Sequence, residues 1–154
     1  MYNFKEKPLV AYIAYEPYGI EYLERFINNY KKFNSGYDHD LLICFKQFKD
    51  NNKIKMWEDR ISINYLKFDD SNQNNDFDIG SYFRIAEKYF KRCILFLDTH
   101  TRPITNNWLK IFTNHYSEKK IIGATASYAS LSSQFLKFYY PQHTKFQQLR
   151  WGLK

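Results

Sequence analysis

Short runs of apolar residues, separated by polar and turn-rich connections, organise the first two thirds of the chain. Residues 9–14, 41–45 and 93–97 are continuous apolar runs of five or six residues. Runs of this length without alternation are typical of strands buried on both faces of a parallel sheet. Residues 61–68 alternate more regularly, which predicts a strand nearer the sheet edge or with one wetter face.

Helical spacing appears between these runs. Apolar residues recur every three or four positions after the first run, at Ile20, Leu23, Phe26, Ile27 and Tyr30. A short amphipathic stretch through Trp57, a helix capped by Asp78 and a helix that begins at Thr105 follow the same logic. Alternating strands and helices predict right-handed crossovers. We therefore expect an α/β fold, a three-layer α/β/α sandwich with a mainly parallel sheet.

Composition places the chain among globular proteins and narrows its partners. The 154 residues are 44% hydrophobic and 20% aromatic, which supplies a substantial core. The formal charge of +7 favours anionic partners such as nucleotide diphosphates or acidic lipid surfaces. The default explanation for the scattered lysines is an ordinary solvated surface. We find no recognisable nucleic-acid motif, so no nucleic-acid partner is expected.

Cysteine use and the start of the chain bear on location. Cys44 and Cys93 both fall in predicted buried strands, so we expect no disulfide framework and a reducing compartment. No secretory segment opens the chain, and no apolar run approaches membrane-spanning length. The expected location is cytoplasmic, and peripheral contact with the inner membrane face stays open.

The candidate chemistry lies where the third apolar run ends. Asp98 follows this run directly, and His100 comes two residues later. In open α/β sheets ligands bind at the carboxyl ends of the strands. A carboxylate and an imidazole in one loop can both turn toward one cation, either Mg²⁺ or, with imidazole, Mn²⁺. The structural alternative is that Asp98 caps the next helix or pairs with Arg102, with His100 a solvated loop residue.

Residues 95–103, Leu-Phe-Leu-Asp-Thr-His-Thr-Arg-Pro, followed by Trp108 and Leu109, resemble the acidic metal motif of family 2-like, GT-A-fold glycosyltransferases. In that family an apolar strand ends in Asp-x-Asp, and a Trp-Leu pair follows. The first Asp of the motif corresponds to Asp98, whereas His100 replaces the last one. The resemblance implies a GT-A fold and a divalent metal, Mn²⁺ or Mg²⁺, held by Asp98 and His100 against the diphosphate of a nucleotide sugar.

The resemblance extends through the first half of the chain, which looks like the opening unit of uncharacterised bacterial glycosyltransferase-like proteins. It implies that the loop after the first strand, with Ala14, Tyr15 and Glu16, contacts the base and ribose of the donor. Lys46, at the end of the second strand, would approach the same nucleotide. The alternative for Lys46 is an ordinary surface lysine.

A further donor contact is implied at the start of the helix that precedes residues 93–97. In family 2-like enzymes this helix begins with a Gly-containing turn that lies against the nucleotide. Here Gly80 would let the backbone approach, with amides facing phosphate and Arg84 adding charge one turn later. The alternative is that Asp78 serves purely as a helix cap. Asp69 and Asp70 fall in a predicted mobile loop and are not proposed as a catalytic base, which stays unassigned.

The chain divides, on this interpretation, into a nucleotide-sugar-binding domain, residues 1–125, and an aromatic, partly helical extension, residues 126–154, that packs on it. Residues 121–125 resemble the next strand of the family, and residues 145–153 are expected to form a last helix. The acceptor half of a GT-A enzyme would ordinarily begin where this chain ends, so we expect the nucleotide-binding half only.

Two functions remain open at this point. The first is a glycosyltransferase that transfers a sugar to a saccharide or lipid-linked acceptor, as in the synthesis of cell-envelope polysaccharide. The second is a non-catalytic nucleotide-sugar-binding remnant or truncated subunit. It would dock on a second copy or a partner transferase through the aromatic tail, residues 135–151.

Overall fold

The structure is a computed structural model that describes residues 4–71, 76–117 and 122–123. The chain divides into two compact units, residues 1–120 and 121–154. Nearly all described residues belong to the first unit, and the account that follows concerns that unit. The expected strand at 121–125, the aromatic tail and the helix at 145–153 lie outside the described residues, apart from Ile122 and Gly123, which form neither strand nor helix.

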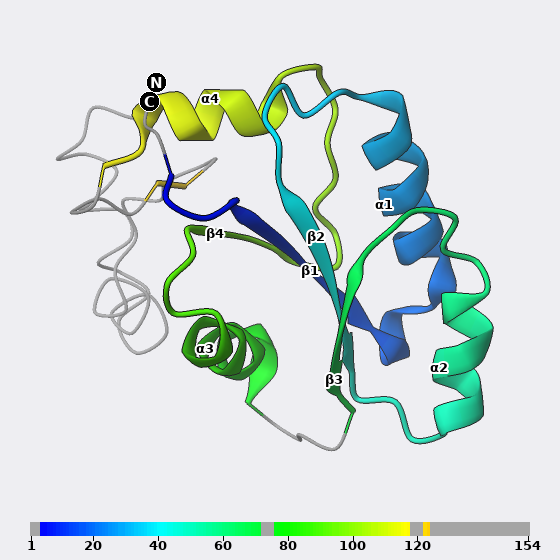
Figure 1. The fold of residues 1–154 in the computed structure, drawn as a ribbon. Helices are drawn as coiled ribbons and strands as arrows, with labels where there is room; N and C mark the ends of the chain where they lie inside the picture. The colour runs from blue at the N-terminus through cyan, green and yellow to red at the C-terminus, as the bar shows by residue number, and fades with distance from the viewer. Residues whose placement is uncertain (1–3, 72–75, 118–121, 124–154) are drawn as a thin grey trace, which may run out of the picture. The chain divides into compact units, whose positions relative to one another are not determined.

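Four parallel strands form the centre of this unit (Figure 1). They are β1 (Leu9–Tyr15), β2 (Asp40–Lys46), β3 (Leu66–Asp70) and β4 (Ile94–Leu97). Their order in the sheet is β3-β2-β1-β4. In this register Leu9 of β1 is aligned with Asp40 on one side and Ile94 on the other. The predicted parallel sheet is confirmed.

Helices cover both faces of the sheet. The helices are α1 (Ile20–Lys32), α2 (Asn51–Glu58), α3 (Phe77–Lys88) and α4 (Trp108–His115), with a 3-10 turn, η1 (Glu16–Tyr18). Buried residues of α1, α2 and α4 pack with one face of β1 and β2, whereas Ile85 of α3 packs on the opposite face. Figure 1 shows α1 and α2 on one side of the sheet and α3 on the other. The α/β class with helices on both faces is confirmed and is compatible with a Rossmann-like sandwich.

Burial on both faces explains the uninterrupted apolar sequences of the central strands. In β1, Val10, Tyr12 and Ala14 face α1 and α4, while the alternate residues face α3. The first six residues of β1 are entirely inaccessible to solvent. A strand in this position has no face on which polar side chains would be hydrated, so alternation is lost.

The sequence predictions for the two outer strands need correction. β3 begins at Leu66 rather than at residue 61, because the side chains of Ile61, Ile63 and Tyr65 pack against the core as an irregular connection. Its predicted place at the sheet edge is confirmed. β4 pairs with β1 alone among the described strands, and Ile94 and Phe96 are only partly buried. The prediction from its apolar run, that this strand is buried on both faces, is therefore only partly correct.

Two helix starts also differ from prediction. α3 begins at Phe77, so Asp76 occupies the N-cap position and Asp78 lies in the first turn. The expectation that Asp78 caps this helix is wrong. α4 begins at Trp108 rather than at Thr105, because Asn107 takes a left-handed conformation with φ 61°. The amide of Asn107 donates to the carbonyl of Asn34 instead, at 2.7 Å.

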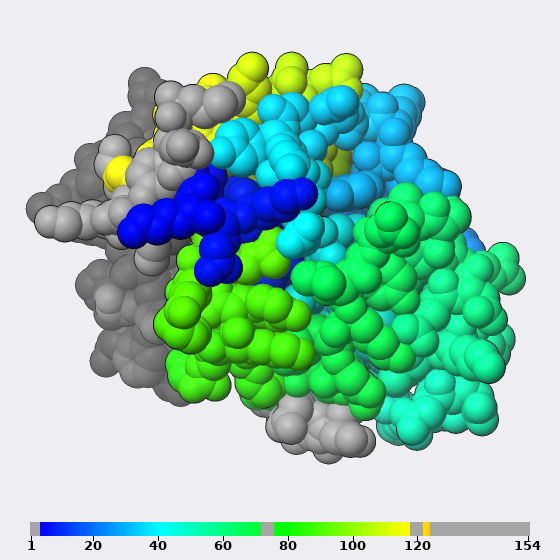
Figure 2. Space-filling view, in the orientation of Figure 1, coloured from blue at the N-terminus to red at the C-terminus, as the bar shows by residue number. Residues whose placement is uncertain are grey.

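Arg92 joins three segments at the amino ends of the strands. Its guanidinium donates to the carbonyls of Lys7 and Pro8 and to the carboxylate of Asp40. In the space-filling view the N-terminal segment lies on the surface beside α3 (Figure 2).

Both cysteines are free thiols, as expected. None of the helices in the described part of the chain combines the length and apolar character needed to cross a membrane.

Candidate functional site

A cavity of about 260 Å³ opens where β1 and β2 end. Tyr15 and Lys46 are the last residues of these strands and are aligned in the register. Neighbouring parallel strands bring their carboxyl ends to the same sheet edge, so the two side chains meet there. The first turn of α3 completes the wall. The lining residues are Tyr15, Tyr18, Lys46, Gln47, Phe77 and Asp78.

The structure brings three predicted site residues together at this cavity, namely Tyr15, Lys46 and Asp78. Ala14 is fully buried in the core. Glu16 forms an ion pair with Lys53 of α2. Neither Ala14 nor Glu16 lines the cavity. Gly80 and Arg84 lie further along α3 and belong to a different arrangement, described below.

Aromatic and amide groups shape one side of the cavity. The hydroxyl of Tyr15 donates to Oε1 of Gln47 at 2.9 Å. The rings of Tyr15 and Tyr18 meet edge to face, with centroids 4.8 Å apart. Gln47 has a left-handed φ of 58°, which turns the chain sharply as β2 ends. Because the side-chain oxygen of Gln47 accepts from Tyr15, the side-chain nitrogen of Gln47 remains as a hydrogen-bond donor.

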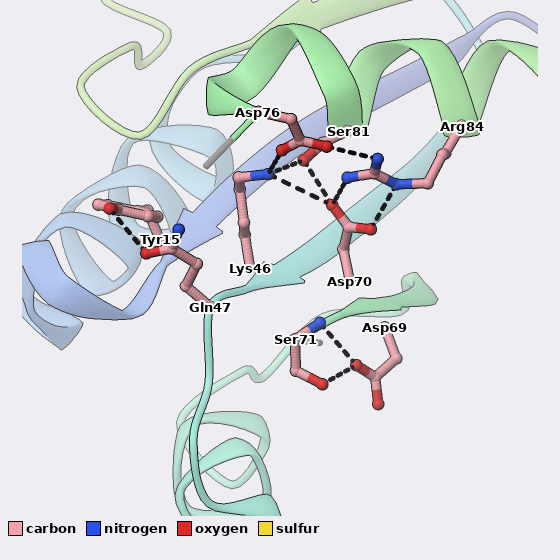
Figure 3. A network of polar contacts seen from close by, with 9 residues as sticks. All are labelled: Tyr15, Lys46, Gln47, Asp69, Asp70, Ser71, Asp76, Ser81 and Arg84. Carbon is pink, nitrogen blue, oxygen red and sulfur yellow. Dashed lines mark hydrogen bonds and ion pairs between the residues drawn. The ribbon is translucent and has the colours of Figure 1, made fainter. Parts of the chain in front are cut away.

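Lys46 is neither a surface lysine nor a free cation. Its side chain is 1% exposed. Its Nζ lies 2.7 Å from Oδ1 of Asp76, 2.9 Å from Oγ of Ser81 and 3.5 Å from Oδ2 of Asp70 (Figure 3). Burial of an ammonium group requires such partners. The charge of Lys46 is thus balanced within the protein.

Arg84 completes the same network. Its guanidinium makes paired contacts of 2.7 and 2.6 Å with Asp70 and a contact of 2.5 Å with Asp76 (Figure 3). Hydrogen bonds from Arg84 and then Lys46 lower the pKa of Asp76 to about 2, and the two carboxylates raise the pKa of Arg84. The two cations and two anions compensate one another. Arg84 is therefore not available for the phosphate contact that the resemblance implied.

Asp69 and Asp70 were expected in a mobile loop, and this expectation is wrong because both belong to β3. Asp70 is the last residue of β3 and is 3% exposed. It accepts from Ser81 at 2.6 Å in addition to its contacts with Arg84. The network of Lys46, Asp70, Asp76, Ser81 and Arg84 therefore joins the ends of β2 and β3 to the first turns of α3.

Gly80 has a role different from the predicted one. A Cβ at this position would lie 1.9 Å from Oδ2 of Asp76. The glycine thus makes room for the carboxylate that pairs with Lys46 and Arg84. The carboxylate of Asp76 pairs with Lys46 and Arg84 and accepts no hydrogen bond from the amides at the start of α3.

The loop after β4 is organised by Asp98. Its Oδ1 accepts from the amides of His100 and Thr101, at 2.9 and 2.8 Å, and from the hydroxyl of Thr101 at 2.6 Å. Asp98 therefore closes its own turn rather than capping α4. Within the described residues it forms no ion pair with Arg102, and no hydrogen bond reaches its Oδ2.

This loop adjoins the cavity through His100. The imidazole meets the rings of Tyr18 and Tyr22 edge to face, each at 4.8 Å between centroids. Burial and, second, the charge of Asp98 raise the pKa of Asp78, so the two carboxylates are within electrostatic reach. Tyr12 and Thr99 tie the loop to β1, since the Tyr12 hydroxyl donates to the Thr99 carbonyl at 2.9 Å.

The donor set for a metal is sparse. No cluster of three or more His, Cys, Asp or Glu side chains suited to a metal ion occurs among the residues that the structure describes. Asp98 offers one carboxylate oxygen, and His100 is exposed beside it. Mg²⁺ is often bound through one or two carboxylates together with substrate phosphates and water. An ion at Asp98 and His100 would therefore depend on further oxygen atoms supplied by a ligand.

Several residues of the site escaped sequence analysis. Tyr18 lies in a turn-rich loop and Gln47 directly follows an apolar run, so their positions gave a signal that was not used. Phe77 gave none, because an apolar residue near a helix start is usually read as core. Asp70, Asp76 and Ser81 were missed because their partners are distant in sequence.

Comparison with known proteins adds no identity to this geometry. No protein-family model matches the chain, and neither a curated protein nor a solved structure is significantly similar to it.

Proposed function

We propose that this chain is a GT-A-type, glycosyltransferase-like protein that binds a nucleotide-diphosphate sugar at the carboxyl edge of its sheet. The observation that carries the proposal is the cavity formed by the ends of β1 and β2 and the start of α3, beside the Asp98 loop. Tyr15 and Asp78 line this cavity, and Tyr18 links it to His100.

The sheet topology supports this location. The crossover from β1 to β2 places α1 on one face, whereas the crossover from β3 to β4 places α3 on the other. The strand order therefore reverses between β1 and β4. In open α/β sheets this switch point is where ligands bind, outside the carboxyl ends of the strands. Tyr15 ends β1, and Asp98 directly follows β4.

The charge balance supports a metal-assisted site. Lys46 and Arg84 are compensated by Asp70 and Asp76, so neither is free to neutralise a diphosphate. A divalent ion, Mn²⁺ or Mg²⁺, held by Asp98 with His100 would supply that charge and stabilise the leaving diphosphate as the glycosidic bond breaks. The acceptor in this proposal is a saccharide or a lipid-linked sugar.

A second function is favoured by one observation. His100 stands where the family motif has its last Asp, and its ring packs against Tyr18 and Tyr22. A single carboxylate is a weak metal site without the help of a ligand. This arrangement suits a protein that binds the nucleotide sugar without transferring it, as a subunit of a partner transferase.

The test compares two aspartates that each accept hydrogen bonds from an amide and a hydroxyl of the residues that follow them. Asp98→Asn keeps a side-chain carbonyl that accepts from the turn amides but removes the charge that holds a cation. Asp69 accepts from the amide and the hydroxyl of Ser71 in a similar way and does not line the cavity, so Asp69→Asn is the control. Calorimetric titration with UDP- and GDP-sugars is carried out with Mn²⁺ and with a chelator.

We expect Mn²⁺-dependent binding that is lost in Asp98→Asn and retained in Asp69→Asn. If no nucleotide sugar binds in the presence of Mn²⁺ or in the presence of the chelator, the donor site is refuted. Release of nucleoside diphosphate over time, with candidate saccharides present, then separates transfer from binding alone.

A further inference from the structure

Two aromatic rings stand exposed around the cavity. The side chain of Phe77 is 83% exposed and that of Tyr18 is 51% exposed, and both residues line the cavity. Phenylalanine is normally among the more buried residue types. An exposed ring at the edge of a polar cavity therefore needs an explanation other than core packing.

The backbone of Phe77 is also strained. Its φ is 51°, in the left-handed region that residues with a bulky side chain rarely occupy. Gln47 has a similar φ, and these two are among the three non-glycine residues with positive φ in the described part of the chain. Both line the cavity. Strained residues gather at ligand sites where the surrounding structure holds them in place.

The ion network explains how Phe77 is held. Asp76, the preceding residue, is fixed by Lys46 and Arg84. The helix amides continue from Gly80, whose amide donates to the Asp76 carbonyl at 3.1 Å. Phe77 thus lies between an anchored carboxylate and the first helical turn. The backbone at Phe77 is therefore held on both sides, which keeps this residue at the edge of the cavity.

The size of the cavity limits what it accepts. Pockets that take a whole small-molecule ligand usually measure about 300–1,000 Å³, and this one measures about 260 Å³. It therefore suits one ring of a larger molecule. The rest of that molecule would extend along the surface toward the Asp98 loop.

We infer that Phe77 and Tyr18 form a stacking slot for the face of one ring of the ligand, with the amide nitrogen of Gln47 donating to the edge of that ring. The ring is a nucleobase or the apolar face of a sugar. This inference rests on the proposed nucleotide-sugar site and adds the residues that select the ring. Aromatic side chains stack on any flat ring face, whereas a fixed amide donor selects rings that carry an acceptor.

The decisive variant is Phe77→Gly. Glycine adopts a positive φ without strain, so this change removes the ring while the fold is retained or stabilised. Phe90 follows the C-cap of α3, is 75% exposed and does not line the cavity, which makes Phe90→Gly the matched control. Uridine, guanosine and a methyl glucoside serve as ring probes, and Mn²⁺-pyrophosphate serves as a ringless probe. Calorimetry measures affinity and urea denaturation measures folding.

We expect Phe77→Gly to weaken the binding of one class of ring probe about tenfold or more. Its affinity for Mn²⁺-pyrophosphate should be unchanged. Phe77→Trp, which keeps an aromatic ring at this position, should retain ring binding. The class affected identifies the ring as base or sugar. Equal effects of the Phe77 and Phe90 changes, or loss of pyrophosphate affinity in Phe77→Gly, would overturn the slot. If nucleotide sugars bind the wild type and Phe77→Gly with equal affinity, the slot is overturned and the proposed function stays intact. If no probe and no nucleotide sugar binds, both the slot and the proposed function are refuted.

Discussion

Gly80 and Asp76 are packed so closely that no larger residue fits between helix and carboxylate. A Cβ on Gly80 would approach Oδ2 of Asp76 to 1.9 Å and its Cγ to 2.1 Å. The same carboxylate bridges Lys46 and Arg84. A glycine within a helix is unfavourable by about 1 kcal/mol relative to alanine, so its presence here reflects the space that the ion network requires.

Gly80→Ala should therefore destabilise the protein although alanine favours helix. We expect the free energy of unfolding to fall by about 1–3 kcal/mol, measured by urea denaturation. The control is the same change in an Asp76→Gly background, where the Oδ2, Cγ and Cβ atoms that the new Cβ would meet are all removed and alanine should be neutral or stabilising. An equal loss in both backgrounds would show that Asp76 is not the cause.

Removal of Lys46 should be among the most damaging single changes. Lys46→Met leaves the carboxylates of Asp70 and Asp76 with Arg84 as their shared cation, and breaking a buried pair typically costs about 3–5 kcal/mol. Lys67 is 43% exposed and pairs with Glu58 at 2.9 Å, so Lys67→Met is the matched surface control, with an expected cost of at most about 1 kcal/mol. Similar unfolding free energies for the two variants would contradict the structural role assigned to Lys46.

His39 should make stability depend on pH near neutrality. Its Nε2 lies 2.6 Å from the Tyr30 hydroxyl and its Nδ1 lies 2.9 Å from the Tyr37 carbonyl. Burial lowers the pKa of His39 below its usual 6.5, against the smaller effects of Asp38 and Asp40. Neutral His39 therefore donates from Nδ1 and accepts from Tyr30.

Because the folded-state pKa is lowered, the unfolded chain takes up the proton first as the pH falls. The contribution of His39 is complete above about pH 6.5 and is lost below it, at a rate of at most about 1.4 kcal/mol per pH unit. Urea midpoints between pH 7.5 and 5.5 should show this slope. His39→Gln should reduce it, whereas His115→Gln, at an exposed position of α4, should not. A slope unchanged in His39→Gln would assign the effect to another group.

Local sequence accounts for the presence of the strands and helices in the described part of the chain, although not for every boundary. The apolar runs at 9–14 and 41–45 became central strands because any segment with no hydrated face must be covered on both sides. The spacing from Ile20 to Tyr30 became α1 because residues three and four apart share one helical face. Asp98 was placed correctly after its strand because a strand end is visible in the sequence.

Tertiary structure decided what the polar residues do. Lys46 lies 30 residues from Asp76 and 35 from Ser81, and no local pattern links residues so far apart. The sequence could not show that Asp70 is buried or that Gly80 serves a carboxylate, because both facts depend on which segments the sheet order brings together. The sequence by itself determined the alternation of buried strands and amphipathic helices, since the burial of apolar side chains follows their local spacing. The tertiary structure alone decided which charges are compensated and which side chains face the cavity, because charge pairing depends on distances in space rather than along the chain.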